Sequence, residues 1–150
     1  MISMRVLGHP APQGSKRHVG RGIMVEASKK VTPWREAVVA ECQRHHVAGR
    51  LMEQPVDIFL SFYFTRPAGH HSASGAVKES APAYPSKRSV GDLDKLVRST
   101  LDALVQASVI ADDSLVVDLT ARKRYATLAN PRGALIRIHE IGERNHGYDR

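Results

Sequence analysis

One stretch limits the possible folds more than any other, the run PVDIFLSFYFTR at residues 55–66. Along an extended backbone, one of its faces carries five apolar side chains: Val56, Ile58, Leu60, Phe62 and Phe64. The opposite face carries Phe59 and Tyr63. A strand that is apolar on both faces is typical of the interior of a sheet. The sequence therefore predicts a sheet with this strand at its centre and helix over at least one face.

Several shorter patterns predict the remaining elements. Alternating apolar residues predict strands at 2–7, 23–25, 115–121 and 134–141, the third ending in the basic run Arg122-Lys123-Arg124. Residues 20–22, Gly-Arg-Gly, predict the turn of a hairpin that contains the strand at 23–25. Thr32-Pro33 predicts a helix start, with Thr as N-cap and Pro at the first helical position, and Gly49 predicts its stop.

Two amphipathic helices are expected. The first places Trp34, Val38, Cys42 and His45 on one face, with Cys42 as a small buried hydrophobe and His45 and His46 near the helix end. The second spans roughly 94–107 and has Asp92 or Asp94 as its N-cap. Its expected core face consists of Leu93, Val97, Leu101, Leu104 and Val105.

An acidic cluster interrupts an otherwise basic chain. The chain has 22 Lys and Arg against 15 Asp and Glu, a net charge of +7, yet residues 91–118 hold six carboxylates: Asp92, Asp94, Asp102, Asp112, Asp113 and Asp118. Like charges repel, so such a cluster indicates a cation or a function that requires it. The basic remainder favours a polyanionic partner such as nucleic acid. Aromatic residues make up only 5% of the chain, so stacking on an aromatic platform is not the expected binding mode.

The spacing of these carboxylates suits a divalent metal. Asp92 and Asp94 point the same way if the backbone is extended, so they can share one cation, and Asp112 or Asp113 from the next element would complete the site. Mg²⁺ held by carboxylates and water can activate water against a phosphodiester. The alternative for each motif is structural: an Asp before a helix is often a cap, and an Asp-Asp pair is often a turn.

Ten basic residues are candidates for DNA contact: Lys16, Arg17, Arg21, Lys78, Lys87, Arg88, Lys95, Arg122, Lys123 and Arg124. The first three belong to a proline-containing loop, and the next three to residues 67–91, which are rich in Pro, Gly, Ser and Ala. A long segment without periodicity is usually functional or mobile. We therefore expect a mobile basic loop at about 67–91 that closes over DNA. Its His70-His71 pair is expected to be solvated and not a metal site.

The combined motif resembles the RusA family of Holliday junction resolvases, small metal-dependent endonucleases of bacteria and phages. The family pattern is Asp-x-Asp-Asn opening a helix, a Lys four residues later, then Asp-Ala-Leu, and then Asp-Asp before a strand. The matching segments here are Asp92-Leu93-Asp94, Asp102-Ala103-Leu104 and Asp112-Asp113. Lys95 replaces the Asn, and Arg98 replaces the Lys, where it can still clamp a phosphate.

The resemblance implies a single compact α/β (α+β) domain over residues 1–150, with a mixed β-sheet of about four to six strands flanked by two main helices. It implies Mg²⁺ or Mn²⁺ dependence, a homodimer, and cleavage of branched double-stranded DNA in recombination and repair. The implied ligands are Asp92, Asp94 and Asp113, with Asp112 in support and Arg98 catalytic. Asp102 and Arg98 are also expected to pair on the helix face, and Asp118 to be only a strand residue.

The path of the chain between these ligands is the open geometric question. A helix from 94 to 107 carries the chain about 20 Å away, so Asp113 completes the site within one chain only if residues 108–113 run almost straight back. We expect that arrangement; otherwise Asp113 serves the partner subunit's site. Two other functions fit the sequence, a non-catalytic basic DNA-binding protein and a nuclease for flaps or forks. A single cysteine and the absence of a long apolar run predict a cytoplasmic protein without membrane contact.

Overall fold

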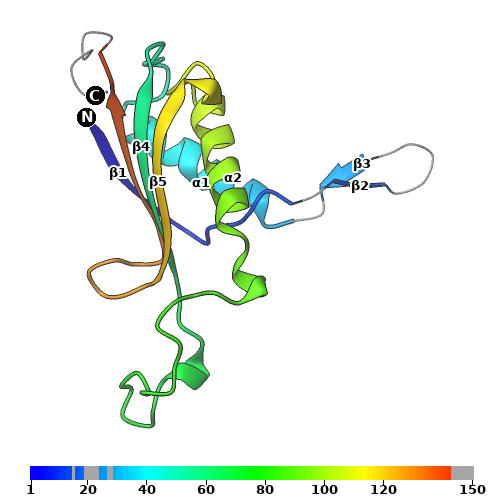
Figure 1. Cartoon of the computed structure of the whole chain (residues 1–150), viewed down its shortest axis with the longest axis vertical. Coiled ribbons are helices and arrows are strands. Elements are labelled where there is room, and N and C mark those ends of the chain that lie inside the picture. The colour runs from blue at the N-terminus through cyan, green and yellow to red at the C-terminus, as the bar shows by residue number, and fades with distance from the viewer. Residues whose placement is uncertain (15, 19–23, 27–28, 143–150) are drawn as a thin grey trace, which may run out of the picture.

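A four-stranded mixed sheet and two helices form one compact domain of the α+β class (Figure 1). The computed structural model describes residues 1–14, the backbone of 16–18 and 24–26, and residues 29–142. The strands lie in the order β1 (Ile2–Leu7), β6 (Gly133–Glu140), β4 (Val56–Phe64) and β5 (Val116–Tyr125). The helices are α1 (Val31–Arg44) and α2 (Leu93–Gln106). The predicted fold class is confirmed.

Shorter elements complete this part of the chain. A separate antiparallel pair consists of β2 (Lys16–His18) and β3 (Met24–Glu26). This pair confirms the predicted hairpin, whose turn at 20–22 lies outside the described residues. Three single 3-10 turns are η1 (Ala68–His70), η2 (Arg88–Val90) and η3 (Asp113–Leu115). Among the described residues, no helix combines the length and apolar character needed to span a membrane.

The run at 55–66 forms the central strand, as predicted. β4 pairs antiparallel with β6 on one side and parallel with β5 on the other. The five alternating residues of its first face are buried against the helices. Its second face is covered differently, because the guanidinium groups of Arg122 and Arg137 lie 5.0 and 5.5 Å from the ring centre of Phe59. Arginine side chains thus cover apolar surface on the strand face opposite that of the five alternating residues.

The predicted core face of α2 is partly wrong. Leu96 is fully buried although it was not expected to be, and Ser99 and Thr100 are buried beside it. The expected residues Leu93, Leu101 and Val105 are only partly buried. The two hydroxyls can be buried because each one donates a hydrogen bond: Ser99 to the Ala11 carbonyl at 2.7 Å and Thr100 to the Leu96 carbonyl at 2.9 Å. Apolar spacing carries no signal for a polar pair of this kind.

Helix α1 begins and ends earlier than predicted. Its N-cap is Lys30, so Thr32 is already helical and Pro33 lies in the first turn, where its missing N–H is tolerated. The helix ends at Arg44, and the chain turns at His46, which has a φ of 54°. The predicted stop at Gly49 is therefore five residues too late, since His46 already adopts the left-handed conformation that commonly ends helices.

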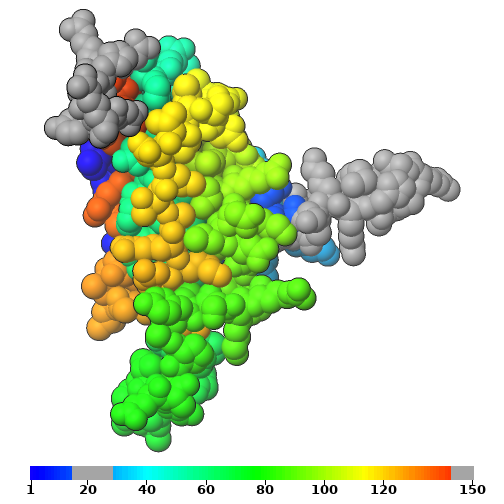
Figure 2. All heavy atoms as spheres, viewed as in Figure 1, coloured from blue at the N-terminus to red at the C-terminus, as the bar shows by residue number. Residues whose placement is uncertain are grey.

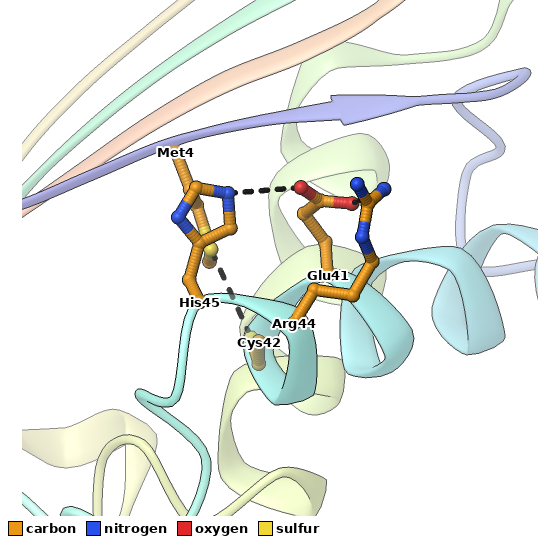
Figure 3. Close-up of polar contacts among 5 residues, drawn as sticks. All are labelled: Met4, Glu41, Cys42, Arg44 and His45. Carbon is orange, nitrogen blue, oxygen red and sulfur yellow. Dashed lines mark hydrogen bonds and ion pairs between the residues drawn. The ribbon is translucent and has the colours of Figure 1, made fainter.

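The last turn of α1 is tied together by side chains (Figure 3). Glu41 accepts from His45 at 2.9 Å and from Arg44 at 3.3 Å, which confirms His45 as a helix-end residue. Cys42 is buried with its Sγ 4.0 Å from the sulfur of Met4. Burial raises the pKa of the Cys42 thiol to about 11, so it behaves as the expected small hydrophobe.

Candidate active site

Asp92 and Asp94 lie at the start of α2 with their carboxylates in solvent. Asp92 occupies the N-cap position with an extended backbone (φ −75°, ψ 138°), but its side chain makes no capping hydrogen bond. The Asp92 side chain is 65% exposed, and its Oδ2 lies 3.6 Å from Nζ of Lys95. Asp94 follows in the first helical turn and is also exposed. The carboxylate oxygens of Asp92 are therefore not used for capping and face solvent.

The chain before Asp92 is fixed from two sides. Nζ of Lys123 on β5 donates to the Gly91 carbonyl at 2.9 Å, which ties this end of α2 to the end of β5. From the other side, the backbone N–H of Gln13 donates to the Lys95 carbonyl at 2.9 Å, and Pro12 packs against Gly91. The proline loop after β1 thus supports the Asp92 end of α2 through its backbone.

Gly91 cannot carry a side chain without strain. Its φ is +103°, and a Cβ placed there would lie 2.7 Å from Cγ of Pro12. We predict that Gly91→Ala lowers the free energy of unfolding by about 1–3 kcal/mol, because strain and the clash add. Thermal denaturation measures this loss. Gly69→Ala is the matched control, since that position has open space and no positive φ, and an equal loss in both variants would contradict the explanation.

Asp112 and Asp113 lie at the opposite end of α2, around the turn η3. Asp112 is the N-cap of η3, and its Oδ1 accepts from the backbone N–H of Ser114 at 2.8 Å. Hydrogen bonding by the Ser114 hydroxyl, with its backbone N–H in addition, lowers the pKa of Asp112 below its ordinary 3.8. A shallow recess at this end is lined by Arg35, Asp102, Val105, Gln106, Asp112 and Asp113. Asp112 therefore remains ionised at neutral pH.

Replacing Ser114 tests whether its hydroxyl lowers the pKa of Asp112. We predict that Ser114→Ala raises the pKa of Asp112, because the hydroxyl is the largest cause of its lowering. A lowered folded-state pKa stabilises the fold above the ordinary value, and that contribution is lost as the pH falls through the lowered value. Carboxyl NMR titration of both proteins in EDTA measures the shift, with Ser72→Ala as the control. An unchanged Asp112 pKa in Ser114→Ala would contradict the assignment.

The two carboxylate pairs are separated by the length of α2. The helix has 14 residues, which is about 20 Å. Residues 108–111 do not run back along it, because backbone hydrogen bonds hold them to residues 51 and 52: Leu51 to Ser108, Met52 to Val109 and Ala111 to Met52. In Figure 1, β5 then runs beside α2 in the opposite direction. The prediction that Asp113 completes the site within its own chain is therefore wrong. Among the described residues, no group of three metal-ligating side chains forms.

Several predicted DNA-contacting residues gather around the Asp92 end. Lys95 pairs with Asp92 and Lys123 donates to the Gly91 carbonyl, while Lys87 precedes and Arg88 begins the turn η2 directly before Gly91. A neighbouring groove of about 400 Å³ is lined by Tyr84, Pro85, Ser86, Leu93, Ala121, Arg122, Lys123 and Arg124. The structure thus brings together the basic run of β5, the end of the 67–91 loop and the start of α2. The run lies inside β5, which continues to Tyr125, so the strand extends four residues beyond the predicted end at 121.

The remaining predicted basic residues lie elsewhere. Lys78 is near the tip of the 67–91 loop, where its N–H donates to the His70 carbonyl. Lys16 and Arg17 belong to strand β2 and not to a loop, and Arg21 lies outside the described residues. No described contact therefore places Lys78, Lys16 or Arg17 near the start of α2.

Arg98 and Asp102 do not form the expected helix-face pair. Within the described part of the chain, the ion pairs do not include this one. Arg98 is exposed on α2, whereas Asp102 lines the recess with Arg35 and Gln106, which bond each other at 3.3 Å. Asp118 is exposed on β5, beside Asp57 in the strand register. The expected pairing of Arg98 with Asp102 is therefore wrong, whereas Asp118 is a strand residue, as expected.

Two contacts at the 67–91 loop were not expected from the sequence. Nη1 of Arg66 donates to the Pro82 carbonyl at 2.8 Å, and its guanidinium stacks 4.1 Å from the ring centre of Tyr125. The guanidinium of Arg124 lies 5.1 Å from the ring centre of exposed Tyr84, on the groove beside α2. Arg66 and Tyr84 are isolated residues in their segments, so no motif marked them. Movement of this loop on DNA binding stays a prediction.

A known protein family matches most of the chain. The family model described as Endodeoxyribonuclease RusA matches residues 8–138, which include β4, β5, most of β6, both helices and all four carboxylates at the ends of α2. No match was found among curated proteins. Members of the matched family hydrolyse phosphodiester bonds as Holliday junction resolvases. The chain therefore belongs to the RusA endodeoxyribonuclease family.

Proposed function

We propose that the chain is a metal-dependent homodimeric endonuclease that resolves four-way DNA junctions by paired cuts during recombination and repair. The family match over residues 8–138 carries this proposal. Two symmetric cuts require two equivalent sites, which a two-fold dimer supplies. The host compartment would be the cytoplasm of a bacterial cell, with the gene of cellular or phage origin.

Each active site takes residues from both subunits. Asp92 and Asp94 come from one subunit and Asp113 from the partner subunit, with Asp112 in support. The separation of the two pairs by the length of α2 supports this division, because residues 108–111 bond Leu51 and Met52 and leave Asp113 at the end of α2 opposite Asp94. A single subunit then carries two half-sites and needs a partner for cleavage.

The residues suit a hard divalent ion. Asp92, Asp94 and Asp113 are exposed carboxylates, and the Asp92 side chain is not consumed by capping. Mg²⁺ or Mn²⁺ prefers such oxygen ligands and retains several waters. When bound, the ion would lower the pKa of water and offset charge on the phosphodiester. Among the chain's own side chains, Lys95 partly neutralises Asp92, and exposed Arg98 is positioned to clamp a phosphate along α2.

Basic side chains near the Asp92 end would orient the DNA backbone. Lys87, Arg88 and Lys95 lie on both sides of Gly91 in the sequence, and Lys123 bonds it from β5. Phosphate contacts of this kind fix register without reading sequence. Binding that depends on them falls steeply as salt is raised.

The direct test uses synthetic DNA with four-way, flap and linear structures. The proposal expects symmetric cuts in the four-way junction with Mg²⁺ or Mn²⁺ and none with EDTA. Preference for flaps or forks would favour the alternative nuclease function. Tight binding without cleavage of any branched DNA, with either metal, would favour a non-catalytic DNA-binding protein.

A further inference from the structure

A cleft lies between the 67–91 loop and the end of β5, apart from the proposed metal ligands. Its volume is about 610 Å³. Figure 2 shows the loop, in green, projecting from the end of the domain beside the orange β5–β6 connection. The lining includes two arginines and several apolar or aromatic side chains: Arg66, Arg124, Val77, Ala83, Tyr125 and Ala126. None of the described residues that line the cleft is acidic, so the lining suits an anionic ligand with an apolar part.

The loop side of the cleft is a small hairpin. His71 and Val77 form an antiparallel bridge, and the N–H of Ser72 donates to the Ala76 carbonyl at 2.8 Å. Nδ1 of His71 also donates to the Gly75 carbonyl at 3.1 Å. A ligand would therefore meet a wall that these bonds already hold in shape.

Both arginines are held in position by an aromatic ring and a carbonyl group. The Arg66 guanidinium lies 4.1 Å from the ring centre of Tyr125. The Arg124 guanidinium lies 5.1 Å from the ring centre of Tyr84. In each arginine, Nη1 donates to a backbone carbonyl at 2.8 Å, and no hydrogen bond among the described residues uses Nη2. Both groups thus keep donors for a ligand, and donors that are already oriented bind at a smaller entropic cost.

The loop side of the cleft is also electropositive. Loss of solvent around the ring, followed by the neighbouring Arg66, Lys87, His71 and Lys78, lowers the pKa of His70 below its ordinary 6.5. His70 is therefore neutral at neutral pH, and the positive charge here comes from arginine and lysine. Phosphate groups fit such a field, and guanidinium groups can bind them with two hydrogen bonds at once.

The cleft adjoins the groove beside the start of α2. Arg124 lines both of them, and Tyr84 lines the groove together with Leu93. Leu93 lies between Asp92 and Asp94 in the sequence. A DNA strand that reaches these two carboxylates and continues along the groove would therefore meet Arg124 and then the cleft.

We propose that the cleft binds one unpaired nucleotide of the DNA strand that passes Asp92, with its phosphate on Arg66 and Arg124 and its base against the apolar lining. This inference rests on the proposed function for its substrate. Bases stack on guanidinium planes as well as on aromatic rings, so Arg66 would extend its stack on Tyr125 to the base. A base inside a duplex is paired and stacked, whereas strands part at the centre of branched DNA. The cleft would therefore favour branched over linear DNA.

Nuclear magnetic resonance of the arginine Nε–H groups tests this binding without cleavage. The probes are the single-stranded trinucleotide d(TTT) and inorganic phosphate, each added to the full chain in EDTA. We expect d(TTT) to shift the signals of Arg66 and Arg124, and to shift them further than phosphate does at the same concentration. Unchanged signals with d(TTT), or equal shifts with phosphate, would overturn the proposal.

Charge insertion shows whether the shifts arise in the cleft. Ala83→Glu places a carboxylate in the lining at an exposed position, so it should abolish the shifts caused by d(TTT). Ala129→Glu is the matched control, because Ala129 is exposed in the β5–β6 connection and is not part of the lining. If Ala129→Glu lost the shifts as completely as Ala83→Glu, the shifts would reflect overall charge and the proposal would be refuted.

Replacing Arg66 by Gln tests the preference for branched DNA. The Kd for a four-way junction in Ca²⁺ should rise by at least about 5-fold, the loss expected for one stacked base and one phosphate contact, and the Kd for a linear duplex should change by less than about 2-fold. Ala83→Glu, which leaves the contacts of Arg66 in place, should show the same difference between the two DNAs. Equal weakening on both DNAs in both variants would contradict the binding of an unpaired nucleotide.

The two proposals fail separately. Junction cleavage by a wild-type protein whose Arg66 and Arg124 signals do not respond to d(TTT) would remove the nucleotide site and leave the proposed function standing. A response to d(TTT) in a protein that cuts no branched DNA would leave the nucleotide site standing and remove the proposed function.

Discussion

Replacing Asp113 by Asn is expected to lower Mg²⁺-dependent cleavage of a four-way junction by at least about 1,000-fold, because it removes one charged ligand of the proposed metal site. Asp113 is exposed in the turn η3, so the substitution disturbs no packing. Junction binding in Ca²⁺ should be unchanged or tighter, since a negative charge near phosphate is removed. Single-turnover cleavage and electrophoretic binding assays measure the two quantities.

Asp57→Asn is the matched control for this loss. It removes the same charge from β4, beside Asp118 and on the strand face opposite that of the buried Val56 and Ile58. Cleavage by Asp57→Asn should stay close to the wild-type rate. If Asp113→Asn cleaved the junction as fast as the control, Asp113 would not be a ligand and the proposed site would be refuted.

Replacing Trp34 by Ala is expected to lower the free energy of unfolding by about 3–5 kcal/mol, the typical cost of removing a large buried aromatic side chain. Trp34 is 1% exposed, and its ring meets Phe62 edge-on with centroids 6.5 Å apart. Its Nε1 donates to Oγ1 of Thr100 on α2 at 3.1 Å. The residue thus joins α1, α2 and the central strand, and its loss affects all three.

Urea denaturation followed by circular dichroism measures this effect. Trp34→Phe retains an aromatic ring but leaves the Thr100 hydroxyl without its donor, so a smaller loss, about 1–3 kcal/mol, is expected. Tyr84→Ala is the control, because Tyr84 is exposed. A Trp34→Ala protein as stable as this control would show that the packing between the helices and β4 is wrongly described.

The fold could be predicted where burial follows a simple period. The run at 55–66 identified the central strand, because few arrangements bury Phe59 and Tyr63 as well as the alternating face. The core face of α2 was harder, since Ser99 and Thr100 are buried by hydrogen bonds to Ala11 and Leu96 carbonyls. Such partners depend on the tertiary structure and leave no periodic trace in the sequence.

The candidate carboxylates of the site could also be identified from their sequence motif. Their arrangement in space could not be predicted from it. The path of residues 108–111 is decided by pairing with Leu51 and Met52, more than fifty residues earlier in the chain. A short apolar segment gives no sign of which distant backbone it will bond. The same limit applies to Lys123, whose bond to Gly91 fixes the active-site end of α2 to β5.

The most direct test of shared active sites mixes two inactive variants. When Asp92→Asn and Asp113→Asn subunits are combined in equal amounts and allowed to exchange, half of the dimers are mixed, and each mixed dimer has one intact site. The mixture then contains about one quarter of the intact sites of the wild type. The rate of nicking of the four-way junction should therefore return to about one quarter of the wild-type rate, mostly as single cuts. If exchange is verified and the mixture remains as inactive as its components, each site is built within one chain, and the account is wrong.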